Sequence, residues 1–234
     1  MKAALSRKID KYYLLVASTE RELIPLRERL GGNPRVSFLC CGVGPVEAAY
    51  SLSRFLAEQS VNPPSGVINF GIAGAYPGTG VDLLDLGLAT GEVMADLGVC
   101  DSEAVHFLTD SALNIKQEFE LDSQPLFKRA ADSLAEENIP FHKGVFVTLN
   151  CASATRERGE FFRNRHQGLC ENMEGAALAR VCAGFAVDFL ELRTISNMVE
   201  DRDSGGKWLI DEACDLGARW FGKLIMNLLQ EKDP

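Results

Sequence analysis

The feature that most constrains the fold is an alternation of short, almost wholly apolar runs with longer amphipathic segments. Strands are expected at residues 12–17, 36–41, 66–71, 144–149 and 187–196, with two weaker strand signals between residues 83 and 99. Helices are expected at residues 19–32, 46–59, 124–138, 171–185 and 207–230. Strands that are apolar throughout are typical of a parallel sheet buried on both faces. The pattern predicts a three-layer α/β domain, with a mostly parallel, partly mixed central sheet flanked by helices.

Size and charge limit the function classes. With 234 residues, 46% of them hydrophobic, the chain can bury one large core, so a single domain over residues 1–234 is expected. The formal net charge of −9 disfavours nucleic acid and anionic membranes as partners and favours a small-molecule substrate. The apolar run at residues 12–17 is too short for a secretory leader or a membrane span, so a cytoplasmic protein is expected. The seven cysteines form no CxxC pair and the three histidines have no ligand spacing, so no metal or cofactor is expected.

Several expected strands end in polar or glycine-rich turns. STERE follows the first strand, GVGP the second, GIAGA the third and SNMVED the last. In parallel α/β sheets, ligands bind beyond the carboxyl ends of the strands, so these turns mark the expected site. GVGP lacks the third glycine of a dinucleotide fingerprint, and Pro45 favours a plain helix-starting turn.

Two acids at these positions each have a structural and a functional interpretation. Glu22 suits the first turn of a helix, but a carboxylate at a strand tip can also orient and deprotonate a water molecule. Glu174 opens the helix expected at residues 171–185, where an acid is favourable. Its two acceptor oxygens also suit the two hydroxyls of a ribose cis-diol, with Met173 as an apolar floor under the sugar.

Three segments together carry a resemblance to a known family. GVINFGIAGAYPG, ENMEGAALA and FLELRTISN resemble, in order, strand context and spacing, the purine nucleoside phosphorylase and nucleosidase superfamily. The resemblance covers nearly the whole chain and is greater for the nucleosidases that act on 5′-substituted nucleosides. The ending SNMVEDRD, with Asn197, is similar to the futalosine hydrolases of menaquinone biosynthesis. The resemblance implies a nucleoside phosphorylase-like fold and a homodimer or higher homo-oligomer.

The resemblance also implies roles for individual residues. It implies that Glu22 prepares the attacking water, that Glu174 binds the ribose diol and that Asn197 meets the leaving purine. Related methylthioadenosine nucleosidases usually carry Glu where this chain has Asn172 and Asp where it has Asn197, so the chain has an amide at both positions. The residues expected to contact the substrate are Ile72, Ala73, Asn172, Met173 and Ser196.

The amide of Asn197 favours a 6-oxopurine over adenine. A 6-oxopurine offers acceptors at N7 and O6, whereas adenine carries a donor amino group beside N7. The NH2 of an asparagine can donate to O6 while its C=O accepts from the N7–H that forms as the purine departs. A mismatched buried polar pair costs roughly 1–3 kcal/mol, which corresponds to about tenfold discrimination or more. Because an amide cannot donate the proton to N7, water or Asp201 is the candidate proton relay.

The expected reaction is hydrolysis of the N-glycosidic bond of futalosine through an oxocarbenium-like ribosyl cation, with release of hypoxanthine. A phosphorylase is the main chemical rival, but Ile72 stands where a phosphate pocket needs a hydroxyl, and GVGP has no arginine. Within the hydrolases, the other candidate substrates are methylthioadenosine, S-adenosylhomocysteine and aminodeoxyfutalosine. A nucleoside-binding protein without catalysis is a rival from another class, which Glu22 and Glu174 disfavour.

Overall fold

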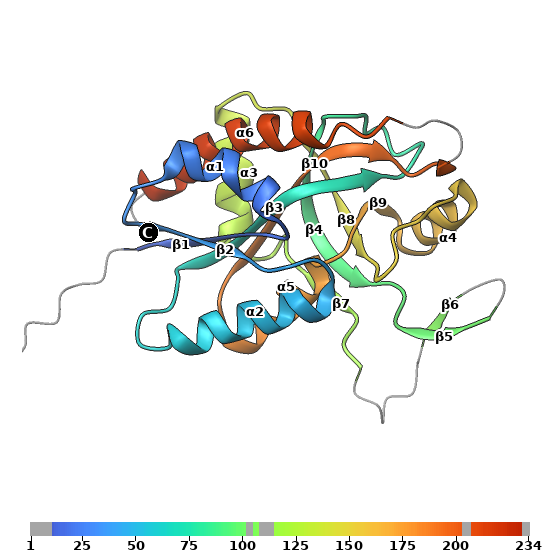
Figure 1. Cartoon of the computed structure of the whole chain (residues 1–234), viewed down its shortest axis with the longest axis horizontal. Helices are drawn as coiled ribbons and strands as arrows, with labels where there is room; N and C mark the ends of the chain where they lie inside the picture. Colours follow the sequence, from blue (N-terminus) through green and yellow to red (C-terminus); the bar gives the residue numbers. More distant parts are fainter. Residues whose placement is uncertain (1–10, 102–104, 108–114, 203–206, 231–234) are drawn as a thin grey trace, which may run out of the picture.

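The computed structural model describes residues 11–101, 105–107, 115–202 and 207–230, in which strands and helices alternate along the chain (Figure 1). The strands are β1 (Tyr13–Ala17), β2 (Val36–Cys40), β3 (Gly66–Ala75), β4 (Leu86–Met94), β5 (Gly98–Cys100), β6 (Val105–Phe107), β7 (Glu118–Glu120), β8 (His142–Thr148), β9 (Gly168–Asn172) and β10 (Phe189–Met198). The helices are α1 (Glu20–Leu30), α2 (Pro45–Glu58), α3 (Pro125–Glu136), α4 (Arg156–His166), α5 (Gly175–Phe185) and α6 (Ile210–Gln230).

One mixed sheet organises the described residues. Its strand order is β10-β4-β8-β9-β3-β1-β2, β7 pairs with β4, and β10 also pairs with β3. The pairs β1–β2, β1–β3, β3–β10, β4–β8 and β8–β9 are parallel, whereas β4–β10, β3–β9 and β4–β7 are antiparallel. Because β3 pairs with both β9 and β10, the strands β3, β10, β4, β8 and β9 form a closed ring. The predicted mostly parallel, partly mixed sheet flanked by helices is confirmed.

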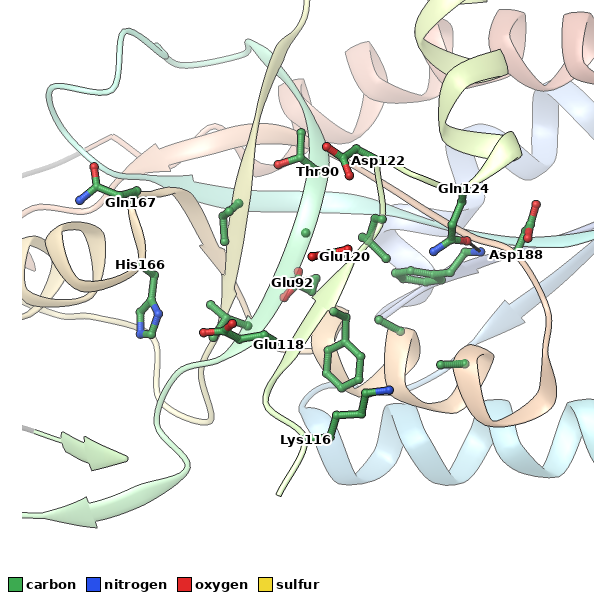
Figure 2. Close-up of a pocket in the computed structure, with 18 of the residues that line it drawn as sticks. Thr90, Glu92, Lys116, Glu118, Glu120, Asp122, Gln124, His166, Gln167 and Asp188 are labelled. Carbon is green, nitrogen blue, oxygen red and sulfur yellow. Dashed lines mark hydrogen bonds between the residues drawn. The ribbon is translucent and has the colours of Figure 1, made fainter. Parts of the chain in front are cut away.

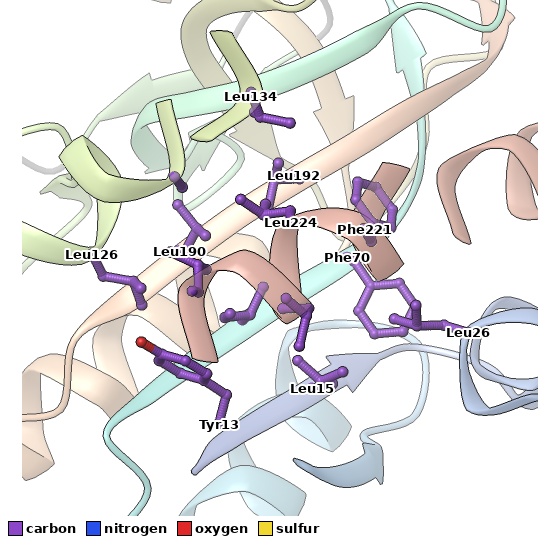
Figure 3. Packing of buried hydrophobic residues seen from close by; sticks show 14 of the residues in the cluster. Tyr13, Leu15, Leu26, Phe70, Leu126, Leu134, Leu190, Leu192, Phe221 and Leu224 are labelled. Atoms are coloured by element: carbon purple, nitrogen blue, oxygen red, sulfur yellow. The ribbon is translucent and has the colours of Figure 1, made fainter. Parts of the chain in front are cut away.

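Helices cover both sides of this sheet. α1, α3 and α6 lie on one side, and α2 and α5 lie on the other (Figure 1). On the first side, Phe221 and Leu224 of α6 pack over Phe70 of β3 and Leu192 of β10 (Figure 3). Burial of such side chains contributes ~1.5–3 kcal/mol each, so this cluster holds β3 and β10 firmly in place. No helix among the described residues is long and apolar enough to cross a membrane.

The segment before α5 differs from the prediction. The helix expected at residues 171–185 begins only at Gly175, and the residues before it form strand β9. All five residues of β9 are buried, and its pairing with β8 and β3 outweighs the helical pattern. Helix α4 and strand β7 were also absent from the prediction. RERGEFFRNRH is too polar to show an apolar helical face, and β7 has only three residues.

Gly175, the first residue of α5, lies against two buried carboxyl groups. A Cβ atom added at Gly175 would overlap one carboxyl oxygen of Glu92 in β4 and one of Glu191 in β10. The exposed fractions of Glu92 and Glu191 are 1% and 0%. The missing side chain therefore lets the start of α5 descend onto the two strands.

Gly175→Ala is expected to lower the free energy of unfolding, because overpacking a buried site costs roughly 1–3 kcal/mol. Urea unfolding followed by circular dichroism measures the change. Gly184→Ala in the same helix is the matched control, since the added Cβ would meet only a guanidinium nitrogen of the exposed Arg180. The control should gain about 0.5–1 kcal/mol from the removal of a helical glycine. Equal losses in the two variants would contradict this account.

Candidate active site

A cavity of about 440 Å³ lies at the carboxyl ends of β1, β3 and β10, beside the start of α5. Polar groups from these separate segments converge on it, as the strand tips of the sequence predict. Eight of the nine predicted site residues line the cavity, namely Glu22, Ile72, Ala73, Asn172, Met173, Glu174, Ser196 and Asn197.

A second, larger cavity of about 1030 Å³ lies between β4, β7 and the end of α4 (Figure 2). Lys116, Glu118 and His166 belong to its wall, and none of the nine predicted site residues does. Size does not identify the site in this protein. The smaller cavity has the convergent, buried polar side chains that binding sites require.

Glu22 caps α1 and also reaches across to β3. Its Oε2 accepts from the Thr19 backbone N–H at 3.0 Å, and Thr19 Oγ1 lies 3.4 Å from the Glu22 backbone nitrogen, which together form a capping box. The hydroxyls of Ser18 and Thr19 also donate to Oε2, at 2.5 and 2.7 Å. Oε1 accepts from the Ile72 backbone N–H at 3.1 Å and retains a second acceptor position. The structural interpretation of Glu22 is thus confirmed, and the carboxylate is fixed in the cavity wall.

Arg193 lies at the centre of the site. Its Nε donates to Glu191 Oε1 at 2.9 Å, its Nη2 to Glu174 Oε2 at 3.3 Å and its Nη1 to the Ile72 carbonyl at 3.2 Å. The residue is 1% exposed. Burial alone would lower the pKa of Arg193, but the carboxylates of Glu191, Glu174 and Glu22 outweigh it and raise the pKa. The guanidinium therefore stays charged in the protein interior.

Glu174 stands at the N-terminal end of α5 but makes no capping bond with its side chain. Its Oε1 accepts from the Gly44 backbone N–H at 3.1 Å, so the GVGP turn touches this carboxylate, and its Oε2 accepts from Arg193. Burial raises the pKa of Glu174, and Arg193 and the Gly44 N–H oppose that rise. Each oxygen retains an acceptor position, so the carboxylate can accept from two neighbouring hydroxyls.

Asn172 uses its side-chain amide inside the protein. Its Oδ1 accepts from the backbone N–H groups of Glu174 and Gly175 at 2.9 and 2.7 Å, and its Nδ2 donates to Glu92 Oε1 at 2.6 Å. An amide supplies both the acceptor and the donor that these contacts use. Asn172 lines the cavity, but its contact with a substrate stays a prediction.

A bulge in β10 positions Asn197. The pairing of β10 with β3 shifts by one residue at Ser196, so that Asn197 lies opposite Gly74. Such bulges re-aim side chains beside sites. Asn197 Oδ1 accepts from Ser196 Oγ at 2.9 Å, whereas its Nδ2 has only a 3.4 Å contact with a backbone carbonyl. The NH2 group is therefore open to a better acceptor.

Glu171 faces Asn197 across the same glycine. Gly74 pairs with Glu171 of β9 on one side and with Asn197 of β10 on the other, so both side chains project from one face of the sheet. Glu171 Oε1 accepts from the Ser153 backbone N–H at 2.7 Å. Its Oε2 is buried, and the hydroxyls of Tyr76 and Ser153 lie beside the carboxyl group. Burial raises the pKa of Glu171.

Asp201 is the predicted site residue that the cavity wall does not include. It is exposed, and its Oδ1 accepts from the Arg156 backbone N–H at 2.9 Å, at the first residue of α4. This contact stabilises the start of α4. The structure does not bring Asp201 together with Glu22, Glu174 and Asn197.

Cationic and aromatic side chains surround the mouth of the cavity. Arg21 and Arg202 both line it, and Arg21 is already paired with Asp211 at 2.6 Å. The guanidinium of Arg202 lies 5.5 Å from the ring centroid of Trp208, whose exposed fraction is 47%. The mouth therefore offers a guanidinium held over an indole ring.

Comparison with known proteins decides the family. The family model described as the phosphorylase superfamily matches residues 21–230. The chain belongs to this superfamily. A futalosine hydrolase of Thermus thermophilus is 35% identical over 188 residues, which cover 80% of this chain and 80% of that protein. A futalosine hydrolase of Streptomyces coelicolor is 33% identical over 190 residues, or 80% of this chain and 77% of that protein.

A solved structure supports the fold of this phosphorylase-superfamily member. The structure of a futalosine hydrolase mutant of Helicobacter pylori strain 26695 aligns with a TM-score of 0.77 at 19% sequence identity. The alignment covers 92% of this chain and 99% of that chain. The predicted nucleoside phosphorylase-like fold is confirmed.

Two site residues of this superfamily member were not singled out from the sequence. Arg193 interrupts the apolar run FLELRTIS together with Glu191, and opposite charges inside a buried strand were the signal available. Glu171 lies three residues before Glu174, and its position in the sequence alone suggests no separate role. Its position opposite Asn197 depends on strand β9, the end of which was expected to be part of a helix.

Proposed function

We propose that this protein is a nucleosidase that hydrolyses futalosine to hypoxanthine and dehypoxanthine futalosine, a step of menaquinone biosynthesis. The observation that carries the proposal is an amide, Asn197, in one small cavity with the buried carboxylates of Glu22 and Glu174. The names of the two curated relatives support the choice of substrate. The proposed reaction uses water and needs no cofactor.

The proposed chemistry begins at the sugar. The bond between the ribose carbon C1′ and the purine N9 breaks, and its electron pair leaves with the purine. Each Glu174 oxygen has one acceptor site that is not used by Gly44 or Arg193, and these sites accept from the ribose hydroxyls. The negative charge of Glu174 stabilises the ribosyl cation. Glu22 holds water through the open position of Oε1 and takes a proton as the water oxygen bonds to C1′.

The proposed contacts with the base select a 6-oxopurine. The NH2 of Asn197 donates to O6, and its C=O accepts from N7–H as that proton arrives. Glu171, whose side chain lines the cavity, accepts from the N1–H of a 6-oxopurine. Adenine has no hydrogen at N1 and cannot make this contact, and such a mismatch costs roughly 1–3 kcal/mol. Since Asp201 is outside the cavity wall, we assign the source of the N7 proton to water.

Hydrolysis is favoured over phosphorolysis by the charges around the cavity. Three carboxylates line it, those of Glu22, Glu171 and Glu174. Arg193 is already shared between Glu191 and Glu174, and no side-chain hydroxyl stands at Ile72. A phosphate ion placed beside Glu22 and Glu174 would meet like charges, whereas a water molecule would not.

The mouth of the cavity suits the substituted end of futalosine, which carries a carboxylate on its 5′ extension. Arg202, held over the Trp208 ring, is the proposed partner of this carboxylate. Arg21 is the less suitable partner because Asp211 already occupies its guanidinium. Methylthioadenosine has no such carboxylate and is therefore the weaker candidate.

A substrate series tests the proposal. Futalosine, aminodeoxyfutalosine, methylthioadenosine and inosine are supplied to the purified protein, and the release of free base is followed by chromatography. Futalosine should have the highest kcat/KM, above inosine because of the 5′ extension and above the two 6-aminopurine compounds because of the base. A preference for methylthioadenosine would overturn the assignment, and tight binding without turnover would support a non-catalytic protein.

Asn197→Asp and Glu171→Gln are expected to shift selectivity toward the 6-aminopurine. The ratio of kcat/KM for futalosine to that for aminodeoxyfutalosine should fall by about tenfold or more in each variant, because an aspartate has no NH2 to donate to O6, and a glutamine NH2 can donate to N1 of the 6-aminopurine. The two substrates carry different groups at C6 of the purine. Asn164→Asp, at an exposed position of α4, is the control and should leave the ratio unchanged. An unchanged ratio in Asn197→Asp would show that Asn197 does not recognise the base.

We also propose that two copies of the chain associate through an apolar face at the start of α2. Val46, Tyr50 and Val43 have exposed fractions of 77%, 62% and 53%. Val46 also lines a groove whose wall includes Met94 and Leu97. Val43 also lines the active-site cavity, so a second copy covering this face would border the cavity mouth.

A cytoplasmic location is proposed as well, since all seven cysteines are free.

Val46→Lys is expected to separate the copies, because a lysine charge would be buried at the interface. Sedimentation velocity should give a dimer for the unchanged protein and a monomer for the variant. Val61→Lys is the control, since Val61 is 92% exposed and lies beyond the other end of α2. A monomer without any substitution would contradict the proposal.

A further inference from the structure

Two carboxyl groups that the proposed chemistry does not use are buried behind the active site. Glu92 and Glu191 lie under Gly175, the first residue of α5. Oε1 of Glu92 and Oε2 of Glu191 occupy the space that a Cβ atom at Gly175 would need. Figure 2 shows Glu92 on β4, at the wall of the second cavity. The two carboxyl groups are therefore in close contact in the protein interior.

Their hydrogen-bond partners differ in charge. Glu191 Oε1 accepts from the guanidinium of Arg193 at 2.9 Å and from Asn69 Nδ2 at 3.0 Å. Among the residues that the structure describes, the donors to Glu92 are neutral groups, Asn172 Nδ2 at 2.6 Å and Thr148 Oγ1 at 2.7 Å. The cation that stabilises an ionised carboxylate is thus on the side of Glu191.

One oxygen remains to be satisfied. Glu191 Oε2 is buried and has no hydrogen-bond partner among the described residues. It is the oxygen that adjoins Glu92 Oε1 beside Gly175. Burial and the Glu191 carboxylate raise the pKa of Glu92 well above its usual range. A proton on Glu92 therefore removes the repulsion between two buried carboxylates and supplies the donor that Glu191 Oε2 lacks.

We propose that Glu92 carries a proton that it shares with Glu191, and that this carboxyl pair positions Arg193 and, through it, Glu174. With Glu92 neutral, the pair bears a single negative charge. That charge holds Arg193 through its Nε and leaves Nη2 for Glu174. Glu92 also binds Asn172, whose Oδ1 accepts from the Glu174 backbone N–H, so the pair supports Glu174 from two directions.

As a consequence, Arg193 holds the Glu174 carboxylate in place without fully neutralising its charge. Arg193 divides its charge between Glu191 at 2.9 Å and Glu174 at 3.3 Å. If Glu191 lost its charge, Arg193 would pair with Glu174 alone, lower the pKa of Glu174 further and compete with the ribose hydroxyls for its oxygens. Glu92 and Glu191 are thus positioning residues, and this part of the inference rests on the proposed function.

Infrared spectroscopy tests the shared proton without any substrate. In D2O at neutral pD, the spectrum of the unchanged protein minus that of Glu92→Gln should show a positive C=O stretching band of a neutral carboxyl group. Glu120→Gln, at an exposed position of β7, should give no such band. A difference spectrum that shows only carboxylate bands would overturn the proposal. A neutral-carboxyl band that disappears in Glu191→Gln but persists in Glu92→Gln would overturn it as well, because the proton would then belong to Glu191. If Glu92→Gln does not fold, titration of the unchanged protein decides: the band should persist from acid to mildly alkaline pD.

The pH dependence of kcat/KM tests the positioning role with any nucleoside that the protein cleaves. In Glu191→Gln, Glu174 should stay ionised to lower pH, so the acid limb of the profile moves to lower pH. Its kcat should fall roughly 10- to 100-fold, by analogy with the loss seen when a residue that orients a metal ligand is removed. In Glu92→Gln, where a neutral amide replaces a neutral acid, the acid limb should stay in place and the loss of kcat should be smaller. An acid limb that moves equally in both variants, or in neither, would overturn the positioning role.

The two readouts separate this inference from the proposed function. If the protein cleaves methylthioadenosine and not futalosine, the substrate assignment is wrong. The infrared band and the pH profile then still test the shared proton and the positioning role. Absence of the neutral-carboxyl band would overturn the shared proton and leave the substrate assignment standing.

Discussion

The site depends on one buried guanidinium, that of Arg193. Its three nitrogens reach β3, the start of α5 and a second position on its own strand β10, so it joins the elements that form the cavity. A buried charge is costly unless it is paired and hydrogen-bonded, and Arg193 is both. The same contacts hold Ile72 and Glu174 in place, and Ile72 in turn holds Glu22. The two carboxylates assigned to water and to sugar are therefore positioned by a common support.

Backbone geometry at the ends of the strands completes the cavity. The β10 bulge at Ser196 brings Asn197 opposite Gly74, and the antiparallel pairing of β9 brings Glu171 to the other side of the same glycine. A Cβ atom at Gly74 would lie 2.9 Å from Asn197 Nδ2, so the glycine lets the amide lie close to β3. The α6 cluster packs against β3 and β10 and supports this arrangement, as the proposed recognition of a flat base by hydrogen bonds requires.

Much of the fold could be predicted from the sequence because its strongest signals are local. The apolar runs that became β1, β2, β3, β8 and β10, and the strand tips that carry Glu22 and Asn197, were visible as short patterns. Strand β9 was not, because GLCEN is short and runs directly into a helical pattern. The pair of Glu92 and Glu191 was not visible either, since the two residues meet only through the pairing of β4 with β10 and the close approach of Gly175. Asp201 shows the converse error, in which an acid near the site in sequence caps a helix outside it.

We propose that this protein transfers the ribosyl group of futalosine to water. The most direct measurement is cleavage of futalosine in ¹⁸O-labelled water, with and without inorganic phosphate, followed by mass spectrometry of both products. The expected products are hypoxanthine and a sugar that carries ¹⁸O, formed at a rate that phosphate does not change. A sugar 1-phosphate formed only when phosphate is present, or no cleavage of futalosine, would contradict it.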